Sequence, residues 1–255
     1  MEFTPTRTVL FATIVCFVCS IFVASAAVGL KEQQDENAKL DKQKKVLDVA
    51  GLLTAEVSAN AESIKKAYSE RVMPVLVPLQ DKGCDGKEVA SFDQLKDSKD
   101  PSTSTDVSGN KAKVQRIPNC AKIFKIKSAD AKSIETYIFP VEGKGLWSTL
   151  YGFIALDPNG VDIKGLTFYK HAETPGLGGE VDNPKWKAQW KGKKAFKAGS
   201  AAPALYVKKG ASNDEYSVDG LSGATLTSNG VTNLLQFWLG DQGFGAYLKD
   251  MKGGK

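Results

Sequence analysis

One uncharged and mostly apolar run, residues 9–30, restricts the fold of this chain more than any other feature. At about 1.5 Å per residue, a helix of roughly 22 residues can cross the hydrocarbon core of a bilayer. A cleaved signal peptide is the alternative, because Ala24-Ser25-Ala26 has the small-x-small form of a cleavage site. We favour a retained anchor, since the apolar run continues through Val28 and Leu30. Both interpretations place the rest of the chain across the membrane.

The residues after the apolar run divide into a charged stalk and one folded body. The stretch 31–45 consists largely of Lys, Glu, Gln, Asp and Asn, which predicts a solvated helical stalk or linker. A chain of 255 residues with 42% hydrophobic content can bury one substantial core. We therefore expect a membrane anchor at 1–30, a stalk at 31–45 and a folded domain at 46–255.

β-Branched and aromatic residues predict a mostly antiparallel sheet in the folded domain. Strand signals occur at 123–126, 134–139, 149–156, 161–169 and, more weakly, 205–207. The turn Asp157-Pro158-Asn159-Gly160 joins the third and fourth of these as a hairpin, and so short a connection implies antiparallel pairing. The chain has no glycine-rich nucleotide fingerprint after a strand, which argues against a doubly wound dinucleotide fold.

Helices packed against this sheet make the expected fold class α+β. A helix over 61–73 has Asn60 as its N-cap and ends at Pro74. The remaining helix signals are a short capped helix at 182–190 that carries Trp186 and Trp190, a helix from about 229 with an apolar stripe of Val231, Leu234, Leu235 and Trp238, and a terminal helix at 245–251.

The four cysteines fall into two groups, two in the apolar run and two in the folded domain. Cys16 and Cys19 lie inside the apolar run on one helix face, where we interpret them as small apolar residues. Cys84 lies in a polar stretch, 82–113, that we expect to be a long surface excursion, and Cys120 follows it. These two could form a disulfide in an oxidising compartment, but the sequence leaves open whether their Cα atoms come close enough.

The run DGLSGATLTSNG at 219–230 concentrates small residues and hydroxyls at the start of a helix. Ser228 or Asn229 is the expected N-cap of that helix. Gly223 and Ala224 leave the backbone open around the hydroxyl of Thr225, where a phosphate would lie near the unpaired N–H groups of the helix. Taken alone, such a run is typical of a polar turn before a capped helix.

The segment DGLSGAT at 219–225 resembles the D-x-x-(S/T)-G-A-T sequence on which a flavin transferase places FMN through a phosphoester bond to the last threonine. Two further segments fit the same family, GLWS at 145–148 and HAETPGLGG at 171–179. Together with the apolar N-terminal segment, they resemble the C subunit of the Na+-translocating NADH:quinone oxidoreductase over nearly the full chain. The G subunit of the electron-transport complex carries the same flavinylation sequence and is the nearest alternative.

The resemblance implies a single-pass protein of the bacterial inner membrane with a cytoplasmic N-terminus and a periplasmic domain. Basic residues flank the apolar run on both sides, so charge alone does not give this orientation. The implied role is an electron carrier that relays electrons from covalent FMN to another flavin-bearing subunit. Its implied partners are the other subunits of the oxidoreductase, a flavin transferase during maturation and the membrane.

The same resemblance implies a cofactor site with Thr225 as the point of attachment. Glycine-rich backbone can approach the flavin ring closely, Leu177 can cover its face, and Thr227 and Ser228 should be dispensable for attachment. The other expected FMN-binding residues are Ser222, Gly223, Ala224, Leu146, Trp147, Ser148, Thr149, Glu173, Thr174, Leu177 and Gly178.

Composition argues against several other functions. The formal net charge is +5, and the lysines are scattered among acids without a basic stripe, so we expect no nucleic-acid surface. The single histidine, His171, argues against a His-built metal site, and we assign it a structural or orienting role. We expect no catalytic residue in the chain itself. A membrane-tethered periplasmic module that binds a ligand noncovalently is the alternative from a different class.

Overall fold

The computed structural model describes residues 4–79, 83–211 and 214–253. The chain divides into two compact units, Met1–Lys42 and Gln43–Lys255. The described part of the first unit lies almost entirely in α1 (Pro5–Val49), which continues into the second unit, so the predicted stalk is helical throughout. One stretch of α1, with a mean hydropathy of 2.6, is long and apolar enough to cross a membrane.

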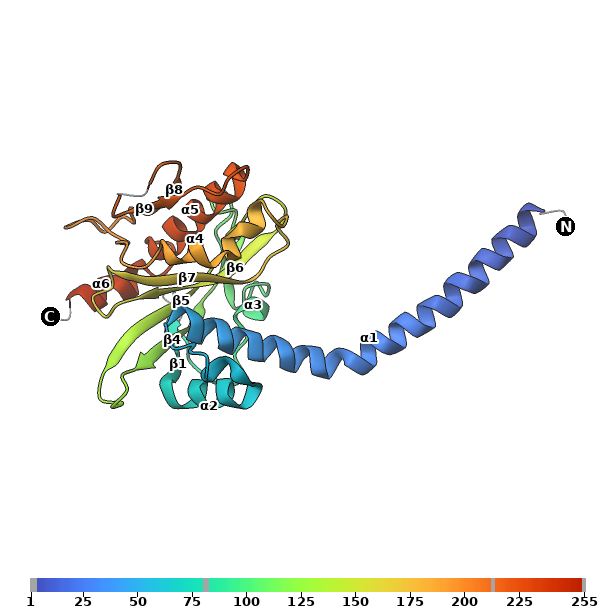
Figure 1. The fold of residues 1–255 in the computed structure, drawn as a ribbon, viewed down its shortest axis with the longest axis horizontal. Helices are drawn as coiled ribbons and strands as arrows, with labels where there is room; N and C mark the ends of the chain where they lie inside the picture. Colours follow the sequence, from blue (N-terminus) through green and yellow to red (C-terminus); the bar gives the residue numbers. More distant parts are fainter. Residues whose placement is uncertain (1–3, 80–82, 212–213, 254–255) are drawn as a thin grey trace. The chain divides into compact units, whose positions relative to one another are not determined.

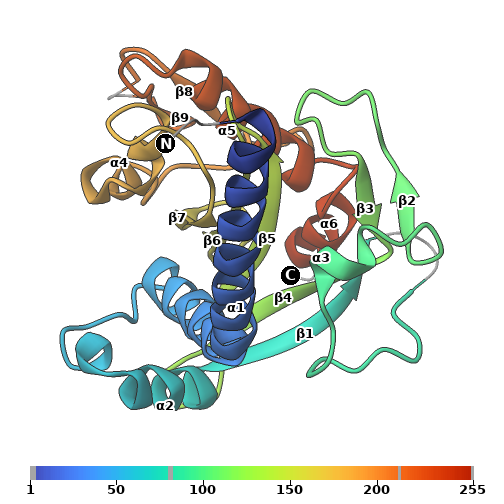
Figure 2. The same ribbon diagram turned by 90° about the vertical axis from the view of Figure 1, so that its right-hand side faces the viewer.

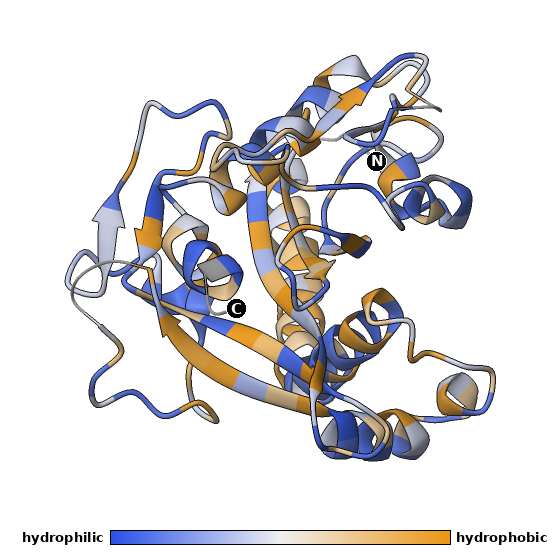
Figure 3. Ribbon diagram, turned by 90° about the vertical axis from the view of Figure 1, so that its left-hand side faces the viewer, coloured by the Kyte–Doolittle hydropathy of each residue, from blue (hydrophilic) through white to orange (hydrophobic). Residues whose placement is uncertain are grey.

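The second unit is built around a five-stranded antiparallel sheet with the order β1-β4-β5-β6-β7 (Figure 1). All four of the main predicted strands and the hairpin between the last two are confirmed. Hydrophobic residues predominate along the strands, with hydrophilic residues at scattered positions between them (Figure 3). The strands are β1 (Val72–Pro78), β4 (Cys120–Lys127), β5 (Ile134–Lys144), β6 (Thr149–Leu156) and β7 (Ile163–Lys170).

Helices cover both faces of this sheet. α5 (Thr225–Leu239) and α6 (Gly245–Gly253) pack on one face, where Leu234 and Trp238 are fully buried. α2 (Ala61–Arg71) and the last turn of α1 lie on the other face, and Leu47 in that turn is fully buried (Figure 1). The predicted α+β class with a mostly antiparallel sheet is confirmed.

The smaller elements form two groups at opposite sides of the unit, the β2–β3 ribbon with α3 and the β8–β9 ribbon with α4 (Figure 2). β8 pairs in parallel with β9. The predicted tryptophan-bearing helix is α4, which carries Trp186 but ends at Ala188, so Trp190 lies in the following turn and not on the helix. The Asn183 side chain caps this helix by accepting the N–H of Lys185 at 2.9 Å. The bounds are η1 (Val57–Ala59), α3 (Gln94–Asp97), β2 (Ser104–Asp106), β3 (Arg116–Pro118), η2 (Gly178–Asp182), α4 (Pro184–Ala188), β8 (Tyr206–Lys208) and β9 (Ser217–Asp219).

The boundary between α2 and β1 differs from the prediction. Asn60 caps the helix as expected, with its side chain 2.8 Å from the N–H of Ser63, but the helix ends at Arg71. The chain then enters β1 directly, a strand that the sequence does not predict because Pro74 indicates a helix stop. β1 lies at the edge of the sheet, where a proline without an N–H group is tolerated.

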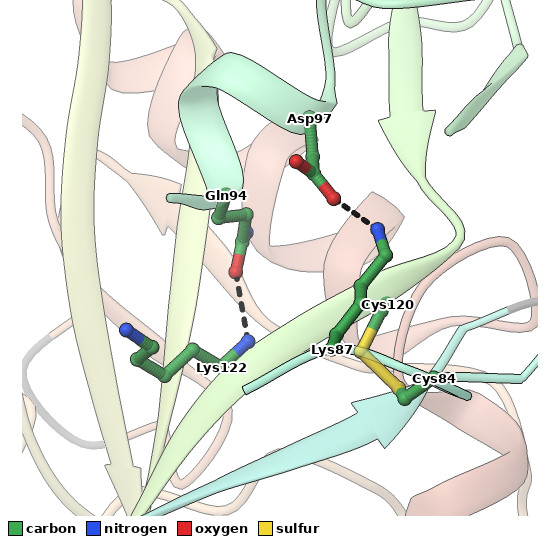
Figure 4. Close-up of a disulfide and its surroundings, with 6 residues drawn as sticks. All are labelled: Cys84, Lys87, Gln94, Asp97, Cys120 and Lys122. Atoms are coloured by element: carbon green, nitrogen blue, oxygen red, sulfur yellow. Dashed lines mark hydrogen bonds and ion pairs between the residues drawn. A yellow bond between two sulfur atoms is a disulfide. The ribbon is translucent and has the colours of Figure 1, made fainter. Parts of the chain in front are cut away.

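The predicted surface excursion is more ordered than expected. It contains α3 and β2, and Ser104 and Ala112 are buried, while residue 82 lies outside the described residues. A disulfide between Cys84 and Cys120, with the Cα atoms 5.3 Å apart, ties it to the start of β4 (Figure 4). A 3.1 Å hydrogen bond from the Lys122 N–H to the Gln94 side chain is a second link to β4, and an ion pair between Lys87 and Asp97 lies within the stretch itself.

Removing this disulfide is expected to lower the free energy of unfolding by about 3–4 kcal/mol, because it closes a long loop in the unfolded chain. The cysteines are 36 positions apart in the sequence. Denaturant unfolding of the full chain in detergent should show the loss in a Cys84→Ala/Cys120→Ala variant. The matched control changes the free cysteines, Cys16 and Cys19, and should unfold like the wild type. Equal stability of all three proteins would contradict the prediction.

Glu142, on β5, should make stability depend on pH. Burial raises the pKa of its carboxyl from 4.5 to about 7. The unfolded chain therefore ionises this group more readily, and the folded state loses stability as pH rises from about 4.5 to 7. A Glu142→Gln variant should be more stable than the wild type at pH 8 by up to about 3 kcal/mol and equally stable at pH 4. Unfolding curves of both proteins at pH 8 and pH 4 test this. A difference in stability between the two proteins that did not change with pH would refute it.

Candidate functional site

The N-terminus of α5 lacks the side-chain cap that most helices have. Thr225 is the first residue of the helix, is exposed, and its hydroxyl makes no hydrogen bond to the described residues. The N-cap position is occupied by Ala224, whose side chain cannot accept a hydrogen bond. The N–H groups of the first turn and the positive end of the helix dipole are therefore available to an anion.

This start of α5 corrects the prediction that Ser228 or Asn229 caps the helix. The hydroxyl oxygen of Ser228 accepts the N–H of Leu221 at 3.0 Å, so it stabilises the preceding loop and not the helix end. Gly223, with a φ of +68°, turns the chain so that the helix begins earlier.

The glycine at 223 also brings the second predicted segment to the helix end. A Cβ atom at Gly223 would lie only 2.9 Å from the Cδ2 atom of Leu177. The two segments 171–179 and 219–225, which are separated in the sequence, therefore touch beside Thr225. Leu177 remains 44% exposed, so it covers the glycine without being buried in the core.

The carboxylate of Glu173 joins these segments to the loop 145–148. Its Oε1 atom accepts the N–H groups of Trp147 at 3.0 Å and Ser148 at 3.1 Å. Its Oε2 atom accepts the N–H of Leu146 at 3.2 Å and the hydroxyl of Thr227 at 2.7 Å. Glu173 is only 5% exposed, so a single buried side chain holds two loops and the first turn of α5 together.

The hydrogen bonds keep this carboxylate ionised. Burial by itself raises the pKa of Glu173, but the Thr227 hydroxyl and the three backbone N–H groups together hold the pKa below its ordinary value. Glu173 is therefore a fixed negative charge within the site at neutral pH.

Three glycines make this close packing possible. A Cβ atom at Gly145 would lie 2.6 Å from Oε1 of Glu173, and one at Gly178 would lie 2.6 Å from Oε2. In α5, a Cβ atom at Gly230 would lie 2.4 Å from the carbonyl oxygen of Lys144. Any side chain at these positions would push the carboxylate or the helix away from the loop.

The structure brings the predicted site residues into one region around the N-terminus of α5. Leu146, Trp147 and Leu177 are large apolar side chains that remain exposed. Ser148 accepts the N–H of Ala172 at 2.7 Å, which adds another link between the loops. The remaining residues are exposed Ser222, Gly223 and Thr174, partly buried Thr149, and buried Ala224 and Gly178.

His171 makes two hydrogen-bond contacts, which fit the structural or orienting role expected of it. Its Nε2 atom lies 2.9 Å from Oδ2 of Asp182, and its Nδ1 atom accepts the N–H of Glu173 at 3.2 Å. The pair of contacts fixes the backbone just before the Glu173 carboxylate. Among the described residues, no group of three or more His, Cys, Asp and Glu side chains could hold a metal ion.

Sequence reasoning missed two residues of this region. Thr227 is fully buried and binds Glu173, although its position two residues after Thr225 gave no sign of a distant partner. Leu226 is 60% exposed beside Thr225 and adds to the apolar surface. A large apolar residue directly after Thr225 was the available signal for the latter.

Comparison with known proteins places this geometry in a family. Residues 145–240 match the family model of the FMN-binding domain, and this range contains all the predicted site residues. The C subunit of the Na(+)-translocating NADH-quinone reductase from Vibrio parahaemolyticus is 44% identical over 246 residues, covering 93% of this chain and 91% of the relative. Its counterpart from Pseudomonas aeruginosa is 44% identical over 258 residues, covering 98% and 97%.

The chain belongs to the family of Na(+)-translocating NADH-quinone reductase C subunits. The crystal structure of NqrC from Shewanella oneidensis has a TM-score of 0.76 and 32% identity, covering 85% of this chain and 99% of that one. The crystal structure of the corresponding protein from Parabacteroides distasonis gives 0.65 and 26%, covering 87% and 96%. The family resemblance inferred from the three sequence segments is thus confirmed, as is the fold.

Proposed function

We propose that this chain carries FMN through a phosphoester bond to Thr225 and relays electrons within the Na(+)-translocating NADH-quinone reductase. The observation that carries this proposal is the exposed hydroxyl of Thr225, which has no hydrogen-bond partner among the described residues and lies at a helix N-terminus without a side-chain cap. Membership of the NqrC family and the match to the FMN-binding domain support both the cofactor and the complex.

The N-terminus of α5 fits a phosphoester for electrostatic reasons. Alanine at an N-cap costs about 1 kcal/mol relative to Ser, Thr, Asp or Asn, because the first N–H groups stay unpaired. A phosphate on Thr225 would supply acceptor oxygens to those groups and a negative charge to the positive end of the helix. Ser222 and Gly223 are exposed beside it, so the loop leaves room for the phosphate and for a modifying enzyme.

When bound, FMN supplies the redox chemistry, and the chain supplies its position and surroundings. Trp147, Leu177 and Leu226 are exposed apolar side chains around the attachment point and would contact the ring. The loop 145–148 and the segment 171–179 would hold the ring between them. Because these side chains remain exposed, one edge of the ring would stay accessible to a redox partner.

The proposal also covers the membrane topology of the chain and its partners. Residues 1–30 anchor the chain in the bacterial inner membrane with a cytoplasmic N-terminus, residues 31–45 are the stalk, and residues 46–255 form a periplasmic FMN domain. A flavin transferase modifies Thr225, and another flavin-bearing subunit receives the electrons. The apolar segment in α1 supports membrane anchoring, and the exposed apolar residues near Thr225 support a contact with a neighbouring protein of the complex there.

Flavin fluorescence on a denaturing gel tests this proposal against a tethered module that binds its ligand noncovalently. The full chain is produced in a bacterial host with and without a flavin transferase. Covalent attachment predicts a fluorescent band only when the transferase is present. A yellow protein that loses all of its flavin on denaturation would overturn the phosphoester and favour the noncovalent module.

A further inference from the structure

The carboxylate of Glu173 accepts as many hydrogen bonds as it can, and all of their donors belong to the chain itself. Two donors approach each carboxylate oxygen, Trp147 and Ser148 at Oε1, and Leu146 and Thr227 at Oε2. A carboxylate has about four lone-pair sites, so all of them are engaged. Glu173 is therefore not available as a direct hydrogen-bond acceptor for a ligand, although its segment lies in the proposed cofactor site.

The surroundings of Glu173 enclose this arrangement on two sides. The backbone at Gly145 approaches Oε1, and the backbone at Gly178 approaches both Oε2 and the Thr227 hydroxyl, each so closely that a Cβ atom would lie 2.6 Å away. Thr227 is itself fully buried and Glu173 is 5% exposed. Removing one partner from such a network leaves a buried polar group without a hydrogen bond and is therefore destabilising.

We propose that Glu173 and Thr227 form a latch: two positioning residues that hold the FMN-facing loops against α5 and keep a negative charge beside the flavin. This inference rests on the proposed function for the flavin, but the latch itself exists in the chain without it. Its first effect is mechanical, because the carboxylate is hydrogen-bonded both to the loop 145–148 and to Thr227 in the first turn of α5, 54 positions after Glu173.

The second effect is electrostatic. A negative charge shielded from water repels electrons added to a nearby group more strongly than an exposed one, because the local dielectric is low. The latch therefore lowers the midpoint potential of the flavin. If Glu173 and Thr227 had only a structural role, their removal would change the stability of the domain but would not shift the midpoint potential of the flavin.

A Glu173→Gln variant separates these effects because it keeps the shape and removes the charge. Its amide oxygen can take the place of Oε1 and still accept the N–H groups of Trp147 and Ser148. Its NH2 group then occupies the position of Oε2 and donates to the Thr227 hydroxyl oxygen, so the N–H of Leu146 loses its acceptor. We expect exchange of the Leu146 amide hydrogen to become at least about tenfold faster, with smaller changes at the next two residues.

The test uses the full chain in detergent, made with and without the flavin transferase. Hydrogen–deuterium exchange resolved by residue is measured on the flavin-free protein, and the midpoint potential is measured by spectroelectrochemical titration of the flavinylated protein. Glu173→Gln should shift the potential in the positive direction and retain covalent flavin. Thr227→Val leaves the acceptor of Leu146 in place but releases the carboxylate from α5, so it should accelerate exchange across the loop 145–148, Leu146 included. Thr227→Ser keeps the hydroxyl and should behave like the wild type.

Glu180→Gln is the matched control, since Glu180 lies in the neighbouring η2 and its Oε2 atom accepts from the Asn183 side chain at 2.6 Å and from no other donor in the part of the chain that the structure describes. It removes a charge from the same region without touching the latch, and its potential and amide exchange should remain close to wild type. Wild-type exchange at Leu146 and an unshifted potential in Glu173→Gln would overturn the latch. An equal shift in Glu180→Gln would overturn the specific role of Glu173. Absence of covalent flavin from the wild type would instead overturn the proposed function, while the exchange data would still decide the latch.

Discussion

A Thr225→Val variant is expected to lose all covalent flavin while keeping its fold and its free energy of unfolding. Valine has the β-branched shape of threonine but no hydroxyl to form the phosphoester. The wild-type hydroxyl is exposed and has no hydrogen-bond partner among the described residues, so its loss should cost little stability. Flavin fluorescence on a denaturing gel and a thermal unfolding curve of the same protein measure both effects.

Thr225→Ser is the control for this substitution, because it retains the hydroxyl at the same helix position. We expect it to keep covalent flavin when the transferase is present. If the valine variant remained as fluorescent as the wild type after denaturation, Thr225 would not be the attachment residue.

Gly230→Ala is expected to destabilise the domain by about 1–3 kcal/mol, although alanine favours a helix over glycine by about 1 kcal/mol. The added Cβ atom would lie 2.4 Å from the carbonyl oxygen of Lys144 and 3.2 Å from the Cα atom of Gly145. Both obstacles are backbone atoms, so α5 would have to move away from the loop 145–148. Chemical unfolding of the full chain measures the change in free energy.

Asn229→Ala provides the comparison within the same helix. Asn229 is exposed, so the substitution should be neutral or stabilise by a few tenths of a kcal/mol through helix propensity. An increase in stability for Gly230→Ala similar to that for Asn229→Ala would show that α5 does not press against the loop as the structure indicates.

The strands and helices were predictable where local pattern decides the structure. β-Branched and aromatic residues along β6 and β7 and the Asp157–Gly160 turn between them predict the hairpin, and the apolar stripe of α5 predicts its buried face. β1 was missed because a proline in a sequence usually weakens a strand assignment, and its position at the edge of the sheet is a tertiary fact.

The residues of the site were predictable, but their connections were not. The amino-acid sequences of the segments 145–148, 171–179 and 219–225 were enough to identify them as parts of the site. The role of Glu173 depends on partners up to 54 positions away, and no local pattern contains that information. The start of α5 was misplaced for a related reason, because the Ser228 hydroxyl is engaged by Leu221 and leaves the helix end uncapped.

Site mapping by mass spectrometry tests covalent attachment most directly. The full chain is produced with a flavin transferase, digested, and its flavin-bearing peptide is fragmented. We predict one FMN group on the peptide that contains residues 219–230, with fragment ions that place it on Thr225. FMN on Ser222 or Thr227, or an unmodified peptide from protein exposed to an active transferase, would contradict the attachment that we propose.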